Sequence, residues 1–186
     1  LVVSDDVVFA IVDPNHKPLD YNQQNDNCWT ERDRASDLWA WRGQPHQLKA
    51  INAQTGDILW DRNVPVAPMT LVADDQHVCF FDGRSVVALD RHSGQDLWTS
   101  EPIITEAERR RGKTKKQAAG EAEASSVATF RTGYGPKLIL AGQYVLYSPF
   151  GRIVALDSAS GETVWDVKKA ERSGHFSPED LFVIDG

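Results

Sequence analysis

The sequence is poor in cysteine, with only Cys28 and Cys79 among its 186 residues. Two cysteines do not make a disulfide framework, so we expect the fold to rest on an apolar core. Cys79 lies in the apolar run VCFF, where a small buried residue is expected. Cys28 lies in an irregular polar stretch, which suits a free surface thiol.

Long apolar runs and an excess of positive charge are also missing. No run approaches the length of a membrane span, and the first residues lack the charged start and apolar core of a signal peptide. The chain does not begin with Met, so its ends leave the compartment open. The net charge of -7 excludes a general electrostatic attraction to nucleic acid. We therefore predict no membrane span and no nucleic-acid partner.

Patterns that carry catalysis are absent as well. The sequence has no Ser-His-Asp pattern, no glycine-rich phosphate loop and no paired cysteine or histidine ligands. The histidines show no metal-ligand spacing; they are His16, His46, His77, His92 and His175. We therefore assign no catalytic residue and no metal ligand.

The feature that is present is a repeat. Three segments align without a gap and share the pattern A-x-[ND]-x-x-[TS]-G-x-x-x-W: 48–60, 86–98 and 153–165. Around each copy, four short apolar segments are separated by Asp, Gly and Ser turns. Four antiparallel strands that recur at about 40 residues are typical of a β-propeller. The fold prediction is all-β, with four-stranded antiparallel blades whose strands we call A to D.

Counting from the repeat gives one partial propeller domain over 1–186. Blade 1 is expected at about 1–63, blade 2 at about 64–100 and blade 3 at about 101–167, with the start of a fourth blade at 168–186. The last residues, 179–186, align with 76–83, which belong to strand B of blade 2. Three blades and the start of a fourth cannot close a ring of the usual four to eight blades. We therefore expect this to be a segment of a larger polypeptide.

The repeat resembles the tryptophan-docking motif of the quinoprotein-like propellers. That superfamily includes pyrroloquinoline-quinone-dependent alcohol dehydrogenases and the propeller lipoprotein of the bacterial outer-membrane barrel-assembly machinery. The resemblance implies that each Trp packs against the Gly-containing turn of a neighbouring blade. It assigns these docking residues: Gly56, Trp60, Gly94, Trp98, Gly161 and Trp165. Because such propellers are mostly exported, we expect the periplasm or the cell envelope.

The redox members of the superfamily need a calcium ion, an Asp base and often a vicinal cysteine pair. The sequence has no adjacent cysteines, and no matching Asp is assigned. We therefore predict no cofactor, and pyrroloquinoline quinone with calcium belongs only to the alternative function. A second place for calcium is the loop from Asp20 to Glu31, which has oxygen ligands at four of the expected positions but Asn25 where Gly is wanted.

Two insertions interrupt the blades. The first, 13–46, lies between strands B and C of blade 1, and the second, 101–134, lies between strand D of blade 2 and strand A of blade 3. Because strands alternate in direction, B-to-C and D-to-A connections leave the same face of a blade. Both insertions therefore decorate one face, and long loops on a rigid scaffold commonly carry function.

The insertions hold aromatic and arginine residues of the kind that dominate binding hot spots. The candidate binding residues are Trp29, Arg32, Trp39, Trp41, Arg42, His46, Arg131 and Tyr134. The alternative is that the tryptophans pack the loop onto the propeller. The basic run 109–116 is either a solvated excursion or a contact for an anionic partner.

The function predicted from these features is a non-catalytic binding or scaffolding β-propeller module within a larger protein. It recognises a partner through the insertion-bearing face. The expected partners are other blades or domains of the parent chain, and a protein. The alternative is part of a pyrroloquinoline-quinone-dependent dehydrogenase-like enzyme.

Overall fold

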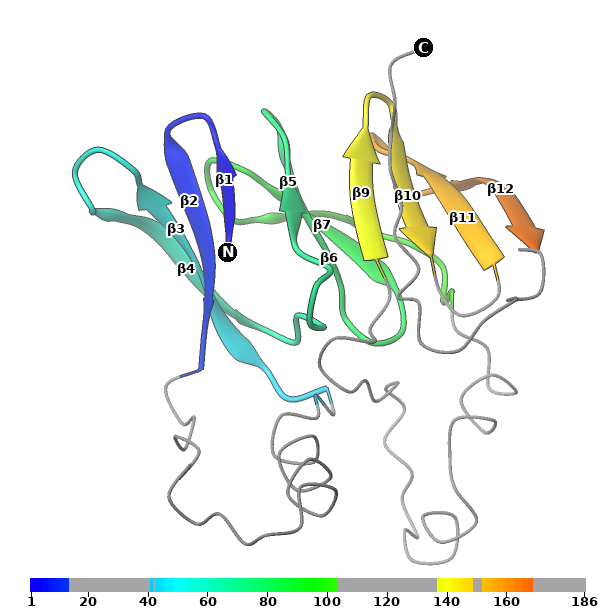
Figure 1. Cartoon of the computed structure of the whole chain (residues 1–186), viewed down its shortest axis with the longest axis horizontal. Coiled ribbons are helices and arrows are strands. Elements are labelled where there is room, and N and C mark those ends of the chain that lie inside the picture. Colours follow the sequence, from blue (N-terminus) through cyan, green and yellow to red (C-terminus); the bar gives the residue numbers. More distant parts are fainter. Residues whose placement is uncertain (14–40, 42, 104–136, 149–151, 169–186) are drawn as a thin grey trace, which may run out of the picture.

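The computed structural model describes residues 1–13, 41, 43–103, 137–148 and 152–168. These residues form strands and turns only, in three four-stranded antiparallel sheets (Figure 1). The all-β prediction and the prediction of propeller blades are therefore confirmed. Within the described ranges, no helix has the length and apolarity needed to cross a membrane.

Each sheet is one blade whose strands follow chain order. Blade 1 contains β1 (Val2–Ser4), β2 (Val7–Val12), β3 (His46–Asn52) and β4 (Ile58–Val64). Blade 2 contains β5 (Val72–Ala73), β6 (His77–Phe81), β7 (Val86–Asp90) and β8 (Asp96–Thr99). Blade 3 contains β9 (Lys137–Ala141), β10 (Tyr144–Ser148), β11 (Arg152–Asp157) and β12 (Thr163–Lys168).

The repeated pattern has the same register in all three blades. The Ala of strand C lies opposite the Trp of strand D, as in the pair Ala50 and Trp60, and the register shifts at the next residue. A bulge at this place twists the strand pair and re-aims the side chains that follow. The small Ala leaves room beside the indole, which explains why these two residue types recur together.

The blades stand side by side through their first strands, because β1 contacts β5 and β5 contacts β9. Blade 2 is buried on both faces. Along β6, Val78 and Phe80 face blade 1, whereas Cys79 and Phe81 face blade 3. This follows from the two-residue period of a strand, and it divides the core into two interface clusters.

The interface clusters differ in composition. The cluster between blades 1 and 2 includes Phe9, Leu48, Trp60 and Phe80. The cluster between blades 2 and 3 includes Trp41, Phe81, Ile103 and Tyr147, and the Phe81 and Tyr147 rings are stacked with centroids 4.7 Å apart. Cys79 is buried, as predicted from its apolar run, and burial raises the pKa of its thiol.

Candidate functional site

The first docking contact joins blades 1 and 2. The Trp60 indole lies on Gly94, so a Cβ added to that glycine would come within 2.8 Å of the ring. The indole Nε1 donates a hydrogen bond of 2.8 Å to the Arg91 carbonyl oxygen. Gly94 also has φ +69, a conformation that a side chain disfavours. Both the space and the backbone therefore require glycine at this turn.

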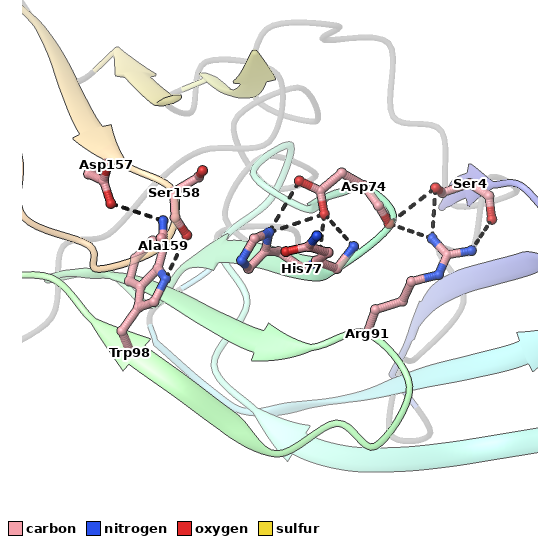
Figure 2. Close-up of polar contacts among 9 residues, drawn as sticks. Ser4, Asp74, His77, Arg91, Trp98, Asp157, Ser158 and Ala159 are labelled. Atoms are coloured by element: carbon pink, nitrogen blue, oxygen red, sulfur yellow. Dashed lines mark hydrogen bonds and ion pairs between the residues drawn. The ribbon is translucent and has the colours of Figure 1, made fainter. Parts of the chain in front are cut away.

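The second docking contact joins blades 2 and 3 with the same geometry. Trp98 lies on Gly161, where an added Cβ would come within 2.4 Å of the indole. Its Nε1 donates a hydrogen bond of 2.9 Å to the Ser158 carbonyl oxygen (Figure 2). Arg91 and Ser158 occupy the same place in the repeat, one residue after the Asp of the pattern. The two tryptophans therefore use equivalent acceptors.

The polar residues of the pattern hold the receiving turns in shape. In blade 2, Asp90 Oδ1 accepts hydrogen bonds from the Ser93 backbone N–H at 2.7 Å and from its hydroxyl at 2.6 Å. Asp157 and Ser160 repeat these bonds in blade 3. The serine bonds lower the pKa of both carboxyl groups. The Asp and Ser of the pattern therefore preform the turn that receives the tryptophan.

Arg91 adds a polar clamp between blades 1 and 2. Its side chain is only 3% exposed. The guanidinium donates to the Ser4 hydroxyl at 2.7 Å, to the Ser4 carbonyl at 2.7 Å and to the Asp74 carbonyl at 2.5 Å (Figure 2). It also lies 3.6 Å from carboxylates of Asp5 and Asp6. We call these residues, Arg91, Ser4, Asp5, Asp6 and Asp74, the Arg91 cluster.

The carboxylate of Asp74 extends the cluster to His77. It accepts bonds from the Gln76 backbone N–H at 2.8 Å and from the His77 backbone N–H at 2.6 Å, and it lies 3.2 Å from His77 Nδ1 (Figure 2). Burial alone would raise the pKa of Asp74, but these hydrogen bonds outweigh burial and lower it. The carboxylate orders the turn between β5 and β6, which in turn places the carbonyl that Arg91 contacts.

The described residues at the ends of the two insertions, which we call the insertion roots, meet on the face of the blades opposite the docking turns. Trp41, at the end of the first insertion, and Ile103, at the start of the second, belong to one buried cluster. Trp41 Nε1 donates a hydrogen bond of 3.2 Å to the Gln44 carbonyl oxygen, and the Arg152 guanidinium donates to the Ile103 carbonyl oxygen. The packing therefore brings both insertions to adjacent points of the scaffold.

The predicted binding residues are only partly within the described ranges. Trp41 is 1% exposed, so its indole packs the core and is removed from the candidate binding surface. His46 is the first residue of β3 instead of a loop residue, and its Nε2 lies 3.9 Å from an Asp13 oxygen. Six candidates lie outside the described residues: Trp29, Arg32, Trp39, Arg42, Arg131 and Tyr134. Cys28, the loop 20–31 and the basic run 109–116 lie outside them as well.

The described residues do not fit the calcium site that a quinone-dependent enzyme requires. In those ranges, no three His, Cys, Asp or Glu side chains are grouped so that they could hold a metal ion. The carboxylates of the Arg91 cluster are instead directed at a guanidinium. We therefore derive no chemical step through a metal or a quinone.

Sequence reasoning missed Arg91 and Arg62 as interface residues. Arg62 donates a hydrogen bond of 2.5 Å to the Gly94 carbonyl and lies 3.1 Å from Asp96 in the next blade. Only their positions in the repeat could have pointed to these arginines, because Arg62 stands two residues after the motif Trp and Arg91 stands one residue after the motif Asp. At the next interface, however, the same offsets hold Ser100 and Ser158. Such a difference between copies does not identify an interface residue until the geometry of the interface is known.

The repeat family of the chain is identified by sequence comparison. A family model described as outer membrane protein assembly factor BamB matches residues 34–122 and 82–178. No curated protein sequence gives a significant match.

Three solved structures resemble the chain at low identity. The BamB structure from Moraxella catarrhalis has a TM-score of 0.47 and 20% identity, covering 71% of this chain and 36% of that one. A europium-containing methanol dehydrogenase has a TM-score of 0.39 and 16% identity, covering 66% of this chain and 21% of that one. The quinohemoprotein alcohol dehydrogenase from Comamonas testosteroni has a TM-score of 0.39 and 17% identity, covering 69% and 18%.

The chain thus spans about a third of the length of the BamB structure that it resembles. The two ranges matched by the family model together cover residues 34–178, which is well over half of the 186 residues. On that match, the chain belongs to the PQQ_2 family of quinoprotein-like propeller repeats, the family described as outer membrane protein assembly factor BamB.

Proposed function

We propose that the chain is a non-catalytic binding or scaffolding propeller that recognises a protein partner through the insertion-bearing face. The observation that carries this proposal is the shared root of the insertions, in which Trp41 and Ile103 pack in one buried cluster. Loops that leave a rigid scaffold at adjacent points can form one continuous surface. On the opposite face, the described turns of blades 2 and 3 at Gly94 and Gly161 receive the docking tryptophans.

A third connection on the same face supports a preformed surface. Between β4 and β5, Thr70 Oγ1 donates a hydrogen bond of 2.7 Å to the Ala67 carbonyl and accepts one of 3.1 Å from the Phe81 N–H. These buried bonds hold Met69 outward, 61% exposed and at φ +65. A methionine held outward in a strained conformation offers an adaptable apolar contact at little ordering cost.

The proposed surface extends over the insertion residues that were predicted to bind. It includes the aromatic and arginine residues Trp29, Arg32, Trp39, Arg42, Arg131 and Tyr134. It leaves out Trp41, which is buried. The family description as an outer membrane protein assembly factor supports a protein partner, and it supports our proposal of a location in the periplasm or the cell envelope.

Site-specific photo-crosslinking in the cells that make the protein tests the proposal. A photoreactive aromatic amino acid replaces Met69 in one variant and Gln54 in another. Both positions are exposed, but Gln54 lies in a turn of the opposite face. We expect a discrete protein adduct from position 69 and none from position 54, because only the first lies on the face from which the insertions leave the blades.

Alanine replacement of Trp29 and Trp39 sharpens the crosslinking test. The double variant is expected to lose the adduct from position 69 while its free energy of unfolding stays within about 0.5 kcal/mol of the parent value, as for substitutions outside the core. Adducts of equal yield from both positions, or an adduct from position 54 alone, would contradict the proposal.

A further inference from the structure

The turn between β4 and β5 contains a residue type that its backbone conformation disfavours. It consists of residues 67–70, and the Thr70 N–H donates a hydrogen bond of 3.3 Å to the Ala67 carbonyl oxygen. Pro68 takes the second place of the turn and Met69 the third, at φ +65. A turn with proline second and a positive φ third is of type II, which favours glycine or asparagine at the third place. The sequence has methionine there instead.

Nothing in the blades compensates for the strain at Met69. Among the described residues, two that are not glycine have a positive φ, Asp5 at +51 and Met69 at +65. An aspartate tolerates this conformation because its short polar side chain can bond to nearby backbone groups, whereas a methionine side chain has no donor for such bonds. Met69 is also 61% exposed, so its strain is not offset by burial of the side chain. The methionine therefore has no explanation in the packing of the blades.

The residues on either side of Met69 hold the turn in place. Ala67 and Thr70 are both fully buried. The Thr70 hydroxyl donates to the Ala67 carbonyl at 2.7 Å, and the Ala67 N–H donates to the Phe81 carbonyl at 2.8 Å. Ala67 also belongs to the buried cluster that contains the insertion roots, Trp41 and Ile103. Strained residues that the surrounding structure holds in this way are concentrated at functional sites. The turn therefore fixes Met69 to the part of the scaffold from which the insertions leave.

We infer that Met69 is the apolar anchor of the contact on the insertion-bearing face, and that the partner protein receives it in an apolar pocket. This inference rests on the proposed function and adds to it the anchoring residue and the chemistry of the partner site. A thioether carries no charge and is only a weak hydrogen-bond acceptor, so an apolar pocket complements it and a charged groove does not. Its unbranched chain adapts to an irregular pocket, and the fixed turn lowers the entropy that is lost on binding. Glycine would relieve the strain but would remove the anchor.

The test separates the strain of the turn from the contact made by the side chain. A photoreactive amino acid replaces Glu101, which is exposed at the start of the second insertion, and its adduct in cells reports the partner. Urea denaturation of the purified variants reports stability. Met69→Gly is expected to raise the midpoint of unfolding and to lower the adduct yield at least about tenfold, because it relieves the strain and removes the anchor. Met69→Asn is expected to have both effects as well, since asparagine tolerates the turn but is polar.

Met69→Leu is the matched control, because leucine keeps both the apolar side chain and the strain. Its adduct yield is expected to stay within about twofold of the parent yield, with no rise in the midpoint of unfolding. An unchanged adduct yield in Met69→Gly would overturn the inference alone, as would a lowered midpoint in that variant or an adduct between two copies of this chain. The absence of any adduct from position 101 in the parent would overturn the proposed function, and the inference with it.

Discussion

The two interfaces between blades share one docking geometry but are stabilised by different side chains. Between blades 1 and 2, the tryptophan contact is joined by Arg62 and by the Arg91 cluster. Between blades 2 and 3, the positions of both arginines hold Ser100 and Ser158, and an apolar cluster with Trp41 and Ile103 takes their place. The docking motif thus sets how blades meet, while the surrounding residues are free to differ.

The two interfaces differ because the insertion roots contribute side chains to only one of them. An insertion root supplies an indole and an isoleucine to the second interface, so apolar burial is available there. The first interface has no such contribution among the described residues, and buried hydrogen bonds to a charged guanidinium stabilise it instead. We expect the receiving glycines to be the most sensitive positions, Arg91 to be less sensitive, and protonation of Asp74 to have the smallest effect.

The first prediction concerns the receiving glycines. Gly161→Ala and Gly94→Ala each place a Cβ against an indole, at 2.4 Å and 2.8 Å, so the tryptophan has to leave its turn. We expect each to lower the free energy of unfolding by about 3–5 kcal/mol, as for truncation of a buried tryptophan. Urea denaturation followed by tryptophan fluorescence measures the loss.

Gly56→Ala is the matched control for both variants, because Gly56 has a similar φ but open space around its Cβ position. Only the backbone strain of about 1–2 kcal/mol is expected there. If all three substitutions cost the same, the docking contact contributes nothing beyond backbone conformation. A larger loss at Gly161 than at Gly94 would show that the apolar interface depends more strongly on its tryptophan.

The second prediction concerns the clamp that only the first interface has. Arg91→Met keeps much of the side-chain length but removes the bonds to Ser4 and Asp74. We expect a loss of about 2–3 kcal/mol, since buried carbonyl groups lose a charged donor. Arg84→Met is the control, because Arg84 is exposed in a neighbouring turn, and its expected change is within about 0.5 kcal/mol. Equal effects would show that the Arg91 cluster is not a stabilising clamp.

The third prediction concerns pH and the carboxylate of Asp74. Hydrogen bonds lower its pKa in the folded protein, so its stabilising contribution is present above the pKa of the unfolded chain and is lost as pH falls through the folded value. We expect the stability difference between the parent and Asp74→Asn to shrink from roughly pH 5 towards pH 3. Denaturation at several pH values measures it.

Asp90→Asn and Asp157→Asn serve as the paired reference for the acid series. Their carboxyl groups make the same serine bonds in the two receiving turns, and both have a lowered pKa. Their pH profiles should therefore agree with each other. A difference between parent and Asp74→Asn that stays constant with pH would show that the charge of Asp74 is not what orders its turn.

The blades and their register were predictable from the sequence because the constraint that sets them is local. A turn at positive φ needs glycine, and an indole opposite a small alanine needs a fixed spacing, so both appear as the repeat. Strand alternation predicts a common face for the two insertions, and the described residues at their ends, Trp41 and Ile103, pack in one cluster. The burial of Trp41 could not be predicted, because packing and exposed alternatives are both compatible with an aromatic loop residue.

The Arg91 cluster shows most clearly which features could not be predicted from the sequence. Nothing in the run DRHSG marks its arginine as buried, because its partners Ser4 and Asp74 come from distant segments of two blades. The sequence contains the periodic features, which are strand alternation, turn glycines and docking tryptophans, since each depends on neighbours a few residues away. Which polar side chains become buried, and which tryptophan packs the core, depends on contacts between segments far apart, and those arise only when the blades stand side by side.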